Sequence, residues 1–147
     1  GYKPSNQCPV MTSSEHPLLP LPLFADRVSC GFPNPCSTFS DHSIDLNQLC
    51  VRSPASTFFV RASGDSMRDK GILDGDLLII DRSVSAVDGD IVLAVLDGEF
   101  TVKCLQTKPC PALVPANPAY STIYLTEEMD FQVWGVVTFA LHQTWGR

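Results

Sequence analysis

Short apolar runs rich in β-branched and aromatic residues recur along the chain from Thr57 onward. Their β-branched and aromatic residues are typical of strands. Asp-Gly pairs join some of these runs and predict hairpins, because both residues tolerate positive φ. The runs are TFFVRA, DLLIID, DIVLAVL, EFTVKCL, TIYL and FQVWGVVTFAL, and the pairs are Asp74-Gly75, Asp88-Gly89 and Asp97-Gly98. This pattern predicts a mostly β fold, a compact folded-over or barrel-like sheet.

The beginning of the chain differs from the β region in composition. Seven of the twelve prolines fall within the first 35 residues, and such a density excludes a helix and favours extended backbone. We expect residues 1–42 to form an extended arm, either a flexible tail or a peptide laid along a surface. We expect a β domain over residues 43–141 and a tail over 142–147. A short helix within 43–51 could begin at a Ser43 cap.

Charge and motif content exclude several classes of function. The chain has 10 Lys and Arg against 16 Asp and Glu, a net charge of -6, which argues against binding through phosphate neutralisation. No apolar run is long enough to span a membrane, and no secretory signal is recognisable. We therefore expect a cytoplasmic protein with free thiols. The cysteines form no CxxC pair and the histidines do not cluster with them, so we expect neither a metal nor a cofactor.

A candidate nucleophile, Ser66, lies in the segment SGDSM directly after a predicted strand. A serine on a tight turn after a strand can expose its hydroxyl beside backbone N–H groups, as a nucleophile with an oxyanion hole requires. Alternatively, Ser66 could cap a turn formed by residues 67–70. The three histidines lie outside the β region, so the base would have to be a lysine that is neutral because it is desolvated.

Strand register selects Lys103 as that lysine. If Asp97-Gly98 is a two-residue hairpin loop, Lys103 pairs with Val92 and Thr101 pairs with Ala94. The strand IVLAVL is apolar on both faces, which indicates burial on both. Lys103 therefore projects onto an apolar surface, where it is either desolvated or extends to solvent at a sheet edge.

With these motifs in place, the sequence resembles the LexA/UmuD family of self-cleaving Ser–Lys peptidases, and within it the UmuD branch of SOS mutagenesis proteins. The resemblance runs from about Leu21 to Leu141. Its segments are PLFADRVSCGFPNP, IDLNQL, SPASTFFVRASGDSM, DGDLLIIDRS, GDIVLAVLDGEFTVK and VWGVV. Two candidate catalytic motifs and a cleavage motif occur in the family's order and spacing, which makes the match specific.

The resemblance implies a function for particular residues. Ser66 would be the nucleophile and Lys103 the general base, with an oxyanion hole made by the backbone N–H groups of Ser66 and Met67. The bond between Cys30 and Gly31 would be the self-cleavage site. The resemblance also implies a homodimer, stimulation by a RecA filament on single-stranded DNA, and association of the shortened form with a UmuC-like, Y-family DNA polymerase for translesion synthesis.

Three alternatives stay open from the sequence. A LexA-type repressor fragment is disfavoured, because the residues before Gly31 are proline-rich and show no helix-turn-helix pattern. A signal peptidase has similar Ser–Lys chemistry but needs a membrane anchor, which this sequence lacks. A non-catalytic module that docks on a polymerase or on RecA would not require Ser66 and Lys103, and both are present.

Overall fold

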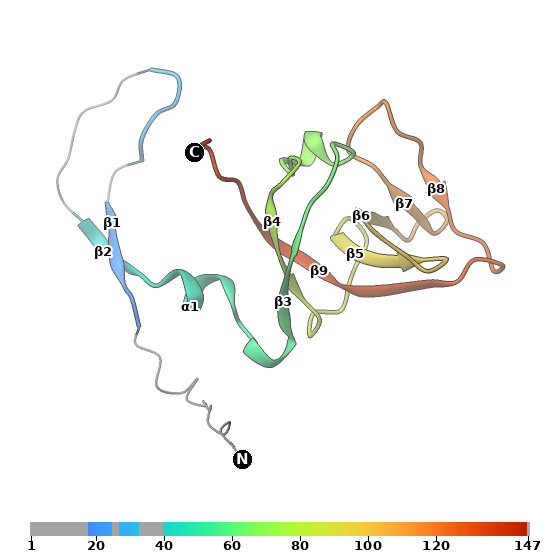
Figure 1. Ribbon diagram of the computed structural model, residues 1–147, viewed down its shortest axis with the longest axis horizontal. Coiled ribbons are helices and arrows are strands. Elements are labelled where there is room, and N and C mark those ends of the chain that lie inside the picture. The colour runs from blue at the N-terminus through green and yellow to red at the C-terminus, as the bar shows by residue number, and fades with distance from the viewer. Residues whose placement is uncertain (1–17, 25–26, 33–39, 147) are drawn as a thin grey trace, which may run out of the picture. The chain divides into compact units, whose positions relative to one another are not determined.

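The computed structural model describes residues 18–24, 27–32 and 40–146, which divide into two compact units between Leu49 and Cys50 (Figure 1). The expected arm of residues 1–42 therefore falls partly outside the described residues. No helix in the described part of the chain is long and apolar enough to cross a membrane.

The first unit contains a small antiparallel hairpin. Strand β1 (Leu21–Phe24) pairs with β2 (Ser40–Ile44), and α1 (Leu46–Cys50) follows. The expected Ser43 cap is wrong, because Ser43 lies in β2 opposite Pro22. Asp45 caps the helix instead. One carboxylate oxygen accepts the backbone N–H of Asn47 at 2.9 Å, and the other accepts that of Leu19 at 2.9 Å.

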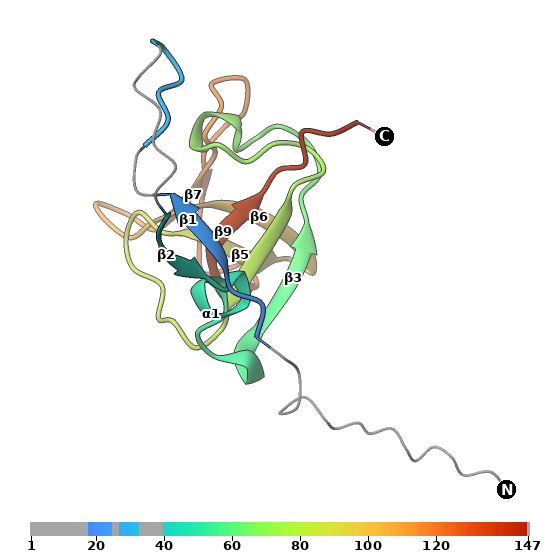
Figure 2. The ribbon, with the colours of Figure 1, turned by 90° about the vertical axis from the view of Figure 1, so that its left-hand side faces the viewer.

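The second unit is built on a seven-stranded sheet with the order β3-β4-β9-β5-β6-β7-β8, in which all neighbours are antiparallel. In Figures 1 and 2 the long strand β9 runs through both halves of this bent sheet. The elements are η3 (Pro54–Ser56), β3 (Thr57–Arg61), η4 (Arg68–Lys70), β4 (Leu77–Asp81), β5 (Ile91–Leu96), β6 (Glu99–Gln106), β7 (Ala112–Val114), β8 (Ile123–Tyr124) and β9 (Phe131–Leu141). The prediction of a mostly β, folded-over sheet is confirmed.

The Asp-Gly pairs behave in two different ways. Asp97 and Gly98 have φ of 50° and 84° and close a two-residue hairpin between β5 and β6. Gly75 and Gly89 also have positive φ, but they lie in longer connections. The prediction of short hairpins at these two pairs is therefore wrong, because β3 and β4 pair across the long connection of residues 62–76, and β4 and β5 are not neighbours in the sheet.

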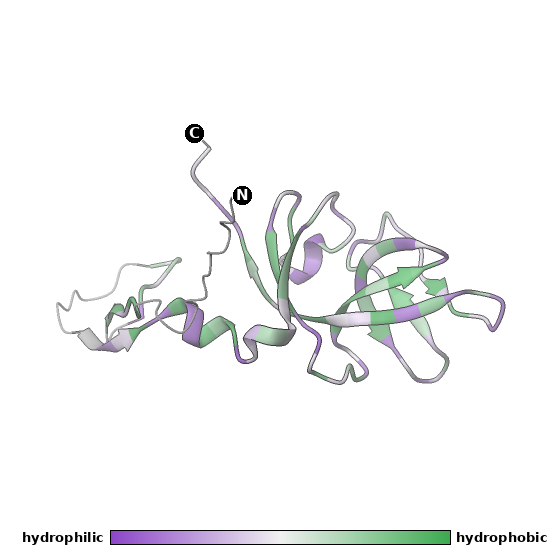
Figure 3. Cartoon of the chain, turned by 60° about the horizontal axis from the view of Figure 1, so that its bottom comes forward, coloured by the Kyte–Doolittle hydropathy of each residue, from purple (hydrophilic) through white to green (hydrophobic). Residues whose placement is uncertain are grey.

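Two hydrophobic clusters form the core, one in each half of the bent sheet. The first is centred on Met67, Leu78, Ile80 and Leu93, and the second on Val92, Leu105, Leu113 and Val136. Figure 3 shows the strands largely in the colour of hydrophobic residues, whereas several turns are hydrophilic. The alternating residues of β5 contribute to both clusters, since Val92 and Leu93 point to opposite faces. This burial on both faces agrees with the apolar sequence of the strand.

Gly135 lies where β9 passes from one half of the sheet to the other. A Cβ added there would lie 2.6 Å from Ile80 Cγ2 and 3.2 Å from the carbonyl oxygen of Asp81. We expect Gly135→Ala to lower the free energy of unfolding by about 1–3 kcal/mol, because the buried neighbours must shift. Urea unfolding measures this, with Gly146→Ala as a control in open space. Equal loss in both variants would contradict the explanation.

Candidate active site

Ser66 lies on a turn that leaves the end of β3. Gly64, two residues earlier, has a φ of 88°, a conformation that glycine adopts without strain. The turn lines a cavity of about 370 Å³ together with residues of β3, β5 and β6. The cavity wall is mostly apolar, with residues that include Phe58, Val60, Ile72, Leu93, Phe100 and Val102. The nucleophile candidate is therefore exposed to a pocket of a size that a peptide side chain can enter.

Lys103 meets Ser66 in this cavity. Strand β6 pairs with β5 in the predicted register, with Val92 opposite Lys103 and Ala94 opposite Thr101. The ammonium nitrogen Nζ of Lys103 lies 3.1 Å from Ser66 Oγ, although 37 positions separate the two residues. Lys103 thus turns into the site and does not extend to bulk solvent, one of the two outcomes that the register left open.

The surroundings of Lys103 favour its neutral form. The side chain is half-buried, and this burial lowers the pKa of Lys103 from its usual 10.5. No carboxylate in the described part of the chain forms an ion pair with it. Nζ also donates to Thr101 Oγ1 at 2.9 Å and to the carbonyl oxygen of Val102 at 3.1 Å. A neutral amine keeps these two bonds and has its lone pair left for the hydroxyl of Ser66.

The alternative role of Ser66 as a helix cap is wrong. The short helix η4 begins after Met67, which occupies the N-cap position, and no side chain caps it. Ser66 precedes that position, and its hydroxyl lies against Lys103 instead. Among the described residues, the backbone N–H groups of Ser66 and Met67 have no protein acceptor. They are therefore free to bind an oxyanion, as an acyl-transfer site requires.

The residues of the expected scissile bond, Cys30 and Gly31, belong to the first unit. Both are exposed, and Cys30 carries a free thiol. The hydroxyl of Ser29 accepts the backbone N–H groups of Gly31 at 3.2 Å and Phe32 at 3.0 Å. These bonds hold a bend at the bond, whereas a peptide in a protease cleft is extended. The structure thus brings Ser66 and Lys103 together within the second unit, whereas the expected cleavage site lies in the first unit.

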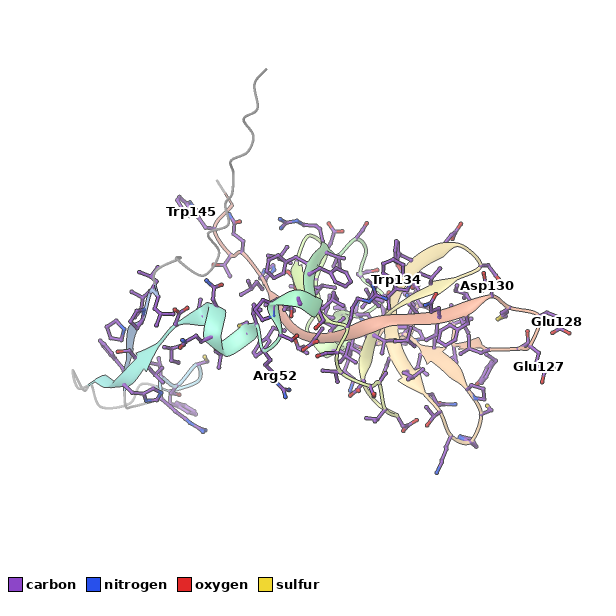
Figure 4. The ribbon with its side chains drawn as sticks, turned by 90° about the horizontal axis from the view of Figure 1, so that it is seen from below. Arg52, Glu127, Glu128, Asp130, Trp134 and Trp145 are labelled. Carbon is purple, nitrogen blue, oxygen red and sulfur yellow. The ribbon has the colours of Figure 1, made fainter. Side chains whose placement is uncertain are left out.

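An aromatic pair supports one wall of the cavity. Phe100 on β6 meets Trp134 on β9 edge to face, with ring centroids 5.2 Å apart. The guanidinium carbon of Arg82 lies 4.8 Å from the Trp134 ring centroid, a cation–π contact. Trp134 is labelled in Figure 4, where it lies along β9. These contacts fix Phe100, which lines the cavity although 61% of its surface is exposed.

Several residues that hold the Ser66 turn were not identified from the sequence. Asp74 Oδ1 accepts the backbone N–H of Gly64 at 2.7 Å, and Asn117 Nδ2 donates to the carbonyl oxygen of Asp65 at 2.9 Å. The hydroxyl of Tyr120 donates to Asp65 Oδ1 at 2.7 Å, and this bond raises the pKa of Tyr120. Polar residues in loops give no sequence signal for such contacts, because their partners lie far along the chain.

The described histidine of the second unit, His142, contacts a carboxylate and not Ser66. Its Nδ1 lies 2.7 Å from Asp76 Oδ1. His42 lies in β2 of the first unit, and His16 lies outside the described residues. Within residues 18–24, 27–32 and 40–146, no group of three or more His, Cys, Asp or Glu could hold a metal ion. Among the described side chains, Lys103 is thus the ionisable group that contacts the hydroxyl of Ser66.

Comparison with known proteins covers most of the chain. A family model described as Peptidase S24-like matches residues 22–138. Protein SamA of Salmonella typhimurium is 51% identical over 123 residues, which cover 84% of this chain and 86% of SamA. Protein MucA of Escherichia coli is 42% identical over 122 residues, 82% of this chain and 84% of MucA. A LexA repressor of Xylella fastidiosa is 39% identical over 120 residues, 81% of this chain and 56% of the repressor.

Proposed function

Because this chain belongs to the Peptidase S24-like family of self-cleaving serine peptidases, we propose that Ser66 and Lys103 cut its own Cys30–Gly31 bond. The observation that carries the assignment is the 3.1 Å contact between Lys103 Nζ and Ser66 Oγ beside a peptide-sized cavity. In this proposal residues 1–42 are the arm that contains the substrate bond, and residues 43–141 form the peptidase domain.

The proposed reaction uses Lys103 first as a base and then as an acid. Neutral Lys103 takes the hydroxyl proton of Ser66, and Ser66 Oγ attacks the carbonyl carbon of Cys30. The backbone N–H groups of Ser66 and Met67 bind the oxyanion of the tetrahedral intermediate. Protonated Lys103 then gives its proton to the departing amine of Gly31. Water, deprotonated by Lys103, hydrolyses the acyl ester and restores Ser66.

The local bend at Cys30–Gly31 has to open before this reaction. The two hydrogen bonds to Ser29 Oγ hold the peptide in a turn, and the scissile carbonyl must instead lie beside Ser66 in an extended segment. Glycine after the scissile bond suits this requirement, because it has no side chain that a narrow cleft must accommodate. Since substrate and enzyme are one chain, the local concentration of the substrate is high.

The chain is a UmuD-like protein of this family, and such proteins act in SOS mutagenesis. We propose that a RecA filament on single-stranded DNA stimulates the cleavage in the bacterial cytoplasm. The product, residues 31–147, would form a homodimer and join a Y-family DNA polymerase for translesion synthesis. A LexA-type repressor is less well supported, because the LexA identity of 39% is lower than the 51% to SamA.

Intact mass spectrometry of the purified protein after incubation at alkaline pH tests this proposal. We expect wild type to yield a fragment that begins at Gly31, and Ser66→Ala to stay intact. Ser85→Ala is the matched control, because Ser85 is exposed in the connection between β4 and β5. If wild type stays intact, the incubation is repeated with RecA, single-stranded DNA and nucleotide. Cleavage of Ser66→Ala, or a cut at another bond, would overturn the assignment.

A further inference from the structure

We propose that Asn117 is a positioning residue for this reaction, because its side-chain amide orients the backbone N–H of Ser66 toward the oxyanion. The inference rests on the proposed role of Ser66 and adds to it a residue 51 positions further along the chain, in the connection between β7 and β8. It follows from how the peptide groups on either side of Ser66 are held.

The peptide group between Asp65 and Ser66 is anchored by its carbonyl oxygen. In a trans peptide the C=O and N–H bonds point in opposite directions, and the one cis bond among the described residues is Lys108-Pro109. Asn117 Nδ2 donates to the Asp65 carbonyl oxygen at 2.9 Å, and the backbone N–H of Arg68 donates to it at 3.2 Å. Whatever fixes this oxygen also fixes the direction of the Ser66 N–H.

The next peptide group is anchored from the same segment. The carbonyl oxygen of Ser66 accepts the backbone N–H of Ala116 at 2.7 Å, which sets the direction of the Met67 N–H in the same way. Ser66 and Met67 line the cavity, whereas Ala116 and Asn117 are not part of its lining. With both carbonyl oxygens turned to residues 116–117, both N–H groups are turned away from that segment, as an oxyanion hole on the cavity side requires.

Asn117 is held tightly enough to act as such an anchor. Only 5% of its surface is exposed, and its Oδ1 accepts the backbone N–H of Ala119 at 3.0 Å. Arg68 Nη2 approaches the same oxygen at 3.5 Å. Asparagine carries a donor and an acceptor on one short side chain, and a buried amide with satisfied partners keeps a single orientation. The loop that contains Asn117 thus serves as a rigid support for the nucleophile turn.

The first test compares the self-cleavage rates of full-length variants. Asn117→Asp keeps the shape and the acceptor for Ala119 but loses the donor to Asp65. We expect its cleavage to be at least about tenfold slower than that of wild type, since one oxyanion donor contributes roughly 10²–10³-fold. Asn117→Ala is a second variant with no buried charge. Asn47→Asp is the matched control, because it makes the same side-chain change at an exposed residue of α1, and we expect wild-type rates.

A second readout separates positioning from general support of the fold. A peptide aldehyde with the sequence of residues 24–30, with alanine in place of Cys30, adds the Ser66 hydroxyl across its C=O bond and places that oxygen in the oxyanion hole. The matched peptide alcohol binds the cleft but forms no adduct. We measure the concentration of each compound that halves the rate of self-cleavage. We expect Asn117→Ala to raise this concentration at least tenfold for the aldehyde and to leave it unchanged for the alcohol.

The outcomes distinguish this inference from the proposed function. Wild-type cleavage rates in both Asn117 variants would overturn the role of Asn117 and leave Ser66 as the nucleophile. Equal weakening of aldehyde and alcohol would also overturn it, because the role would then be structural. Failure of the proposed function shows itself elsewhere, as cleavage of Ser66→Ala or as a wild-type cut at another bond.

Discussion

Replacing Lys103 with methionine is expected to abolish self-cleavage while the protein stays folded. Methionine has a similar length but cannot accept the hydroxyl proton of Ser66, which Lys103 Nζ approaches at 3.1 Å. Loss of the base should lower the rate by about 10³-fold or more. The fraction of intact chain, followed by mass spectrometry at alkaline pH, measures this directly.

The fold of this variant should change little. The amine of Lys103 is desolvated without an ion-pair partner among the described residues, and an apolar side chain of similar volume often replaces a buried charge without loss of stability. We expect a thermal midpoint close to that of wild type. Lys108→Met is the matched control, because Lys108 is exposed in the connection after β6, and it should cleave at the wild-type rate. Cleavage of Lys103→Met at that rate would show that another group is the base.

Local signals were sufficient to predict most strands of the seven-stranded sheet and the position of Lys103. The positive φ of Asp97 and Gly98 depends on those residues alone, and it fixes the turn between β5 and β6. Once a hairpin loop is fixed, the pairing of every following residue is determined by counting. The prediction that Lys103 pairs with Val92 therefore needed no knowledge of the rest of the fold, and it is confirmed.

Features that depend on distant partners could not be predicted in this way. The tight space around Gly135 is set by Ile80 and Asp81, which lie far away along the chain, and β7 is short and lies between prolines, so neither has a distinct local pattern. The same reason applies to Asn117, whose amide contacts Asp65, 52 positions away. The Cys30–Gly31 bond came from family resemblance alone, because a small residue followed by glycine is common in any sequence.

The rate of self-cleavage is expected to rise with pH and then to level off. Burial lowers the pKa of Lys103 below 10.5, and the proposed mechanism requires the neutral amine. Below this lowered pKa the neutral fraction, and with it the rate, should increase about tenfold per pH unit. Above the pKa of Lys103 the rate should become constant. This plateau should begin at a lower pH than it would if Lys103 were fully exposed. A rate that does not change between pH 7 and pH 9 would contradict Lys103 as the base.

The thermal stability of the protein should depend on the same titration of Lys103, even in a variant that does not cleave itself. Because the pKa of Lys103 is lower in the native chain than in the unfolded chain, the native state loses this proton first as pH rises. The cost of burying the charge is therefore present at neutral pH and disappears as pH rises through the native pKa toward 10.5. Comparison of Ser66→Ala with Ser66→Ala/Lys103→Met isolates this effect. We expect the thermal midpoint of the first variant to rise relative to the second between pH 7 and pH 10, whereas a constant difference would mean that Lys103 titrates like an exposed lysine.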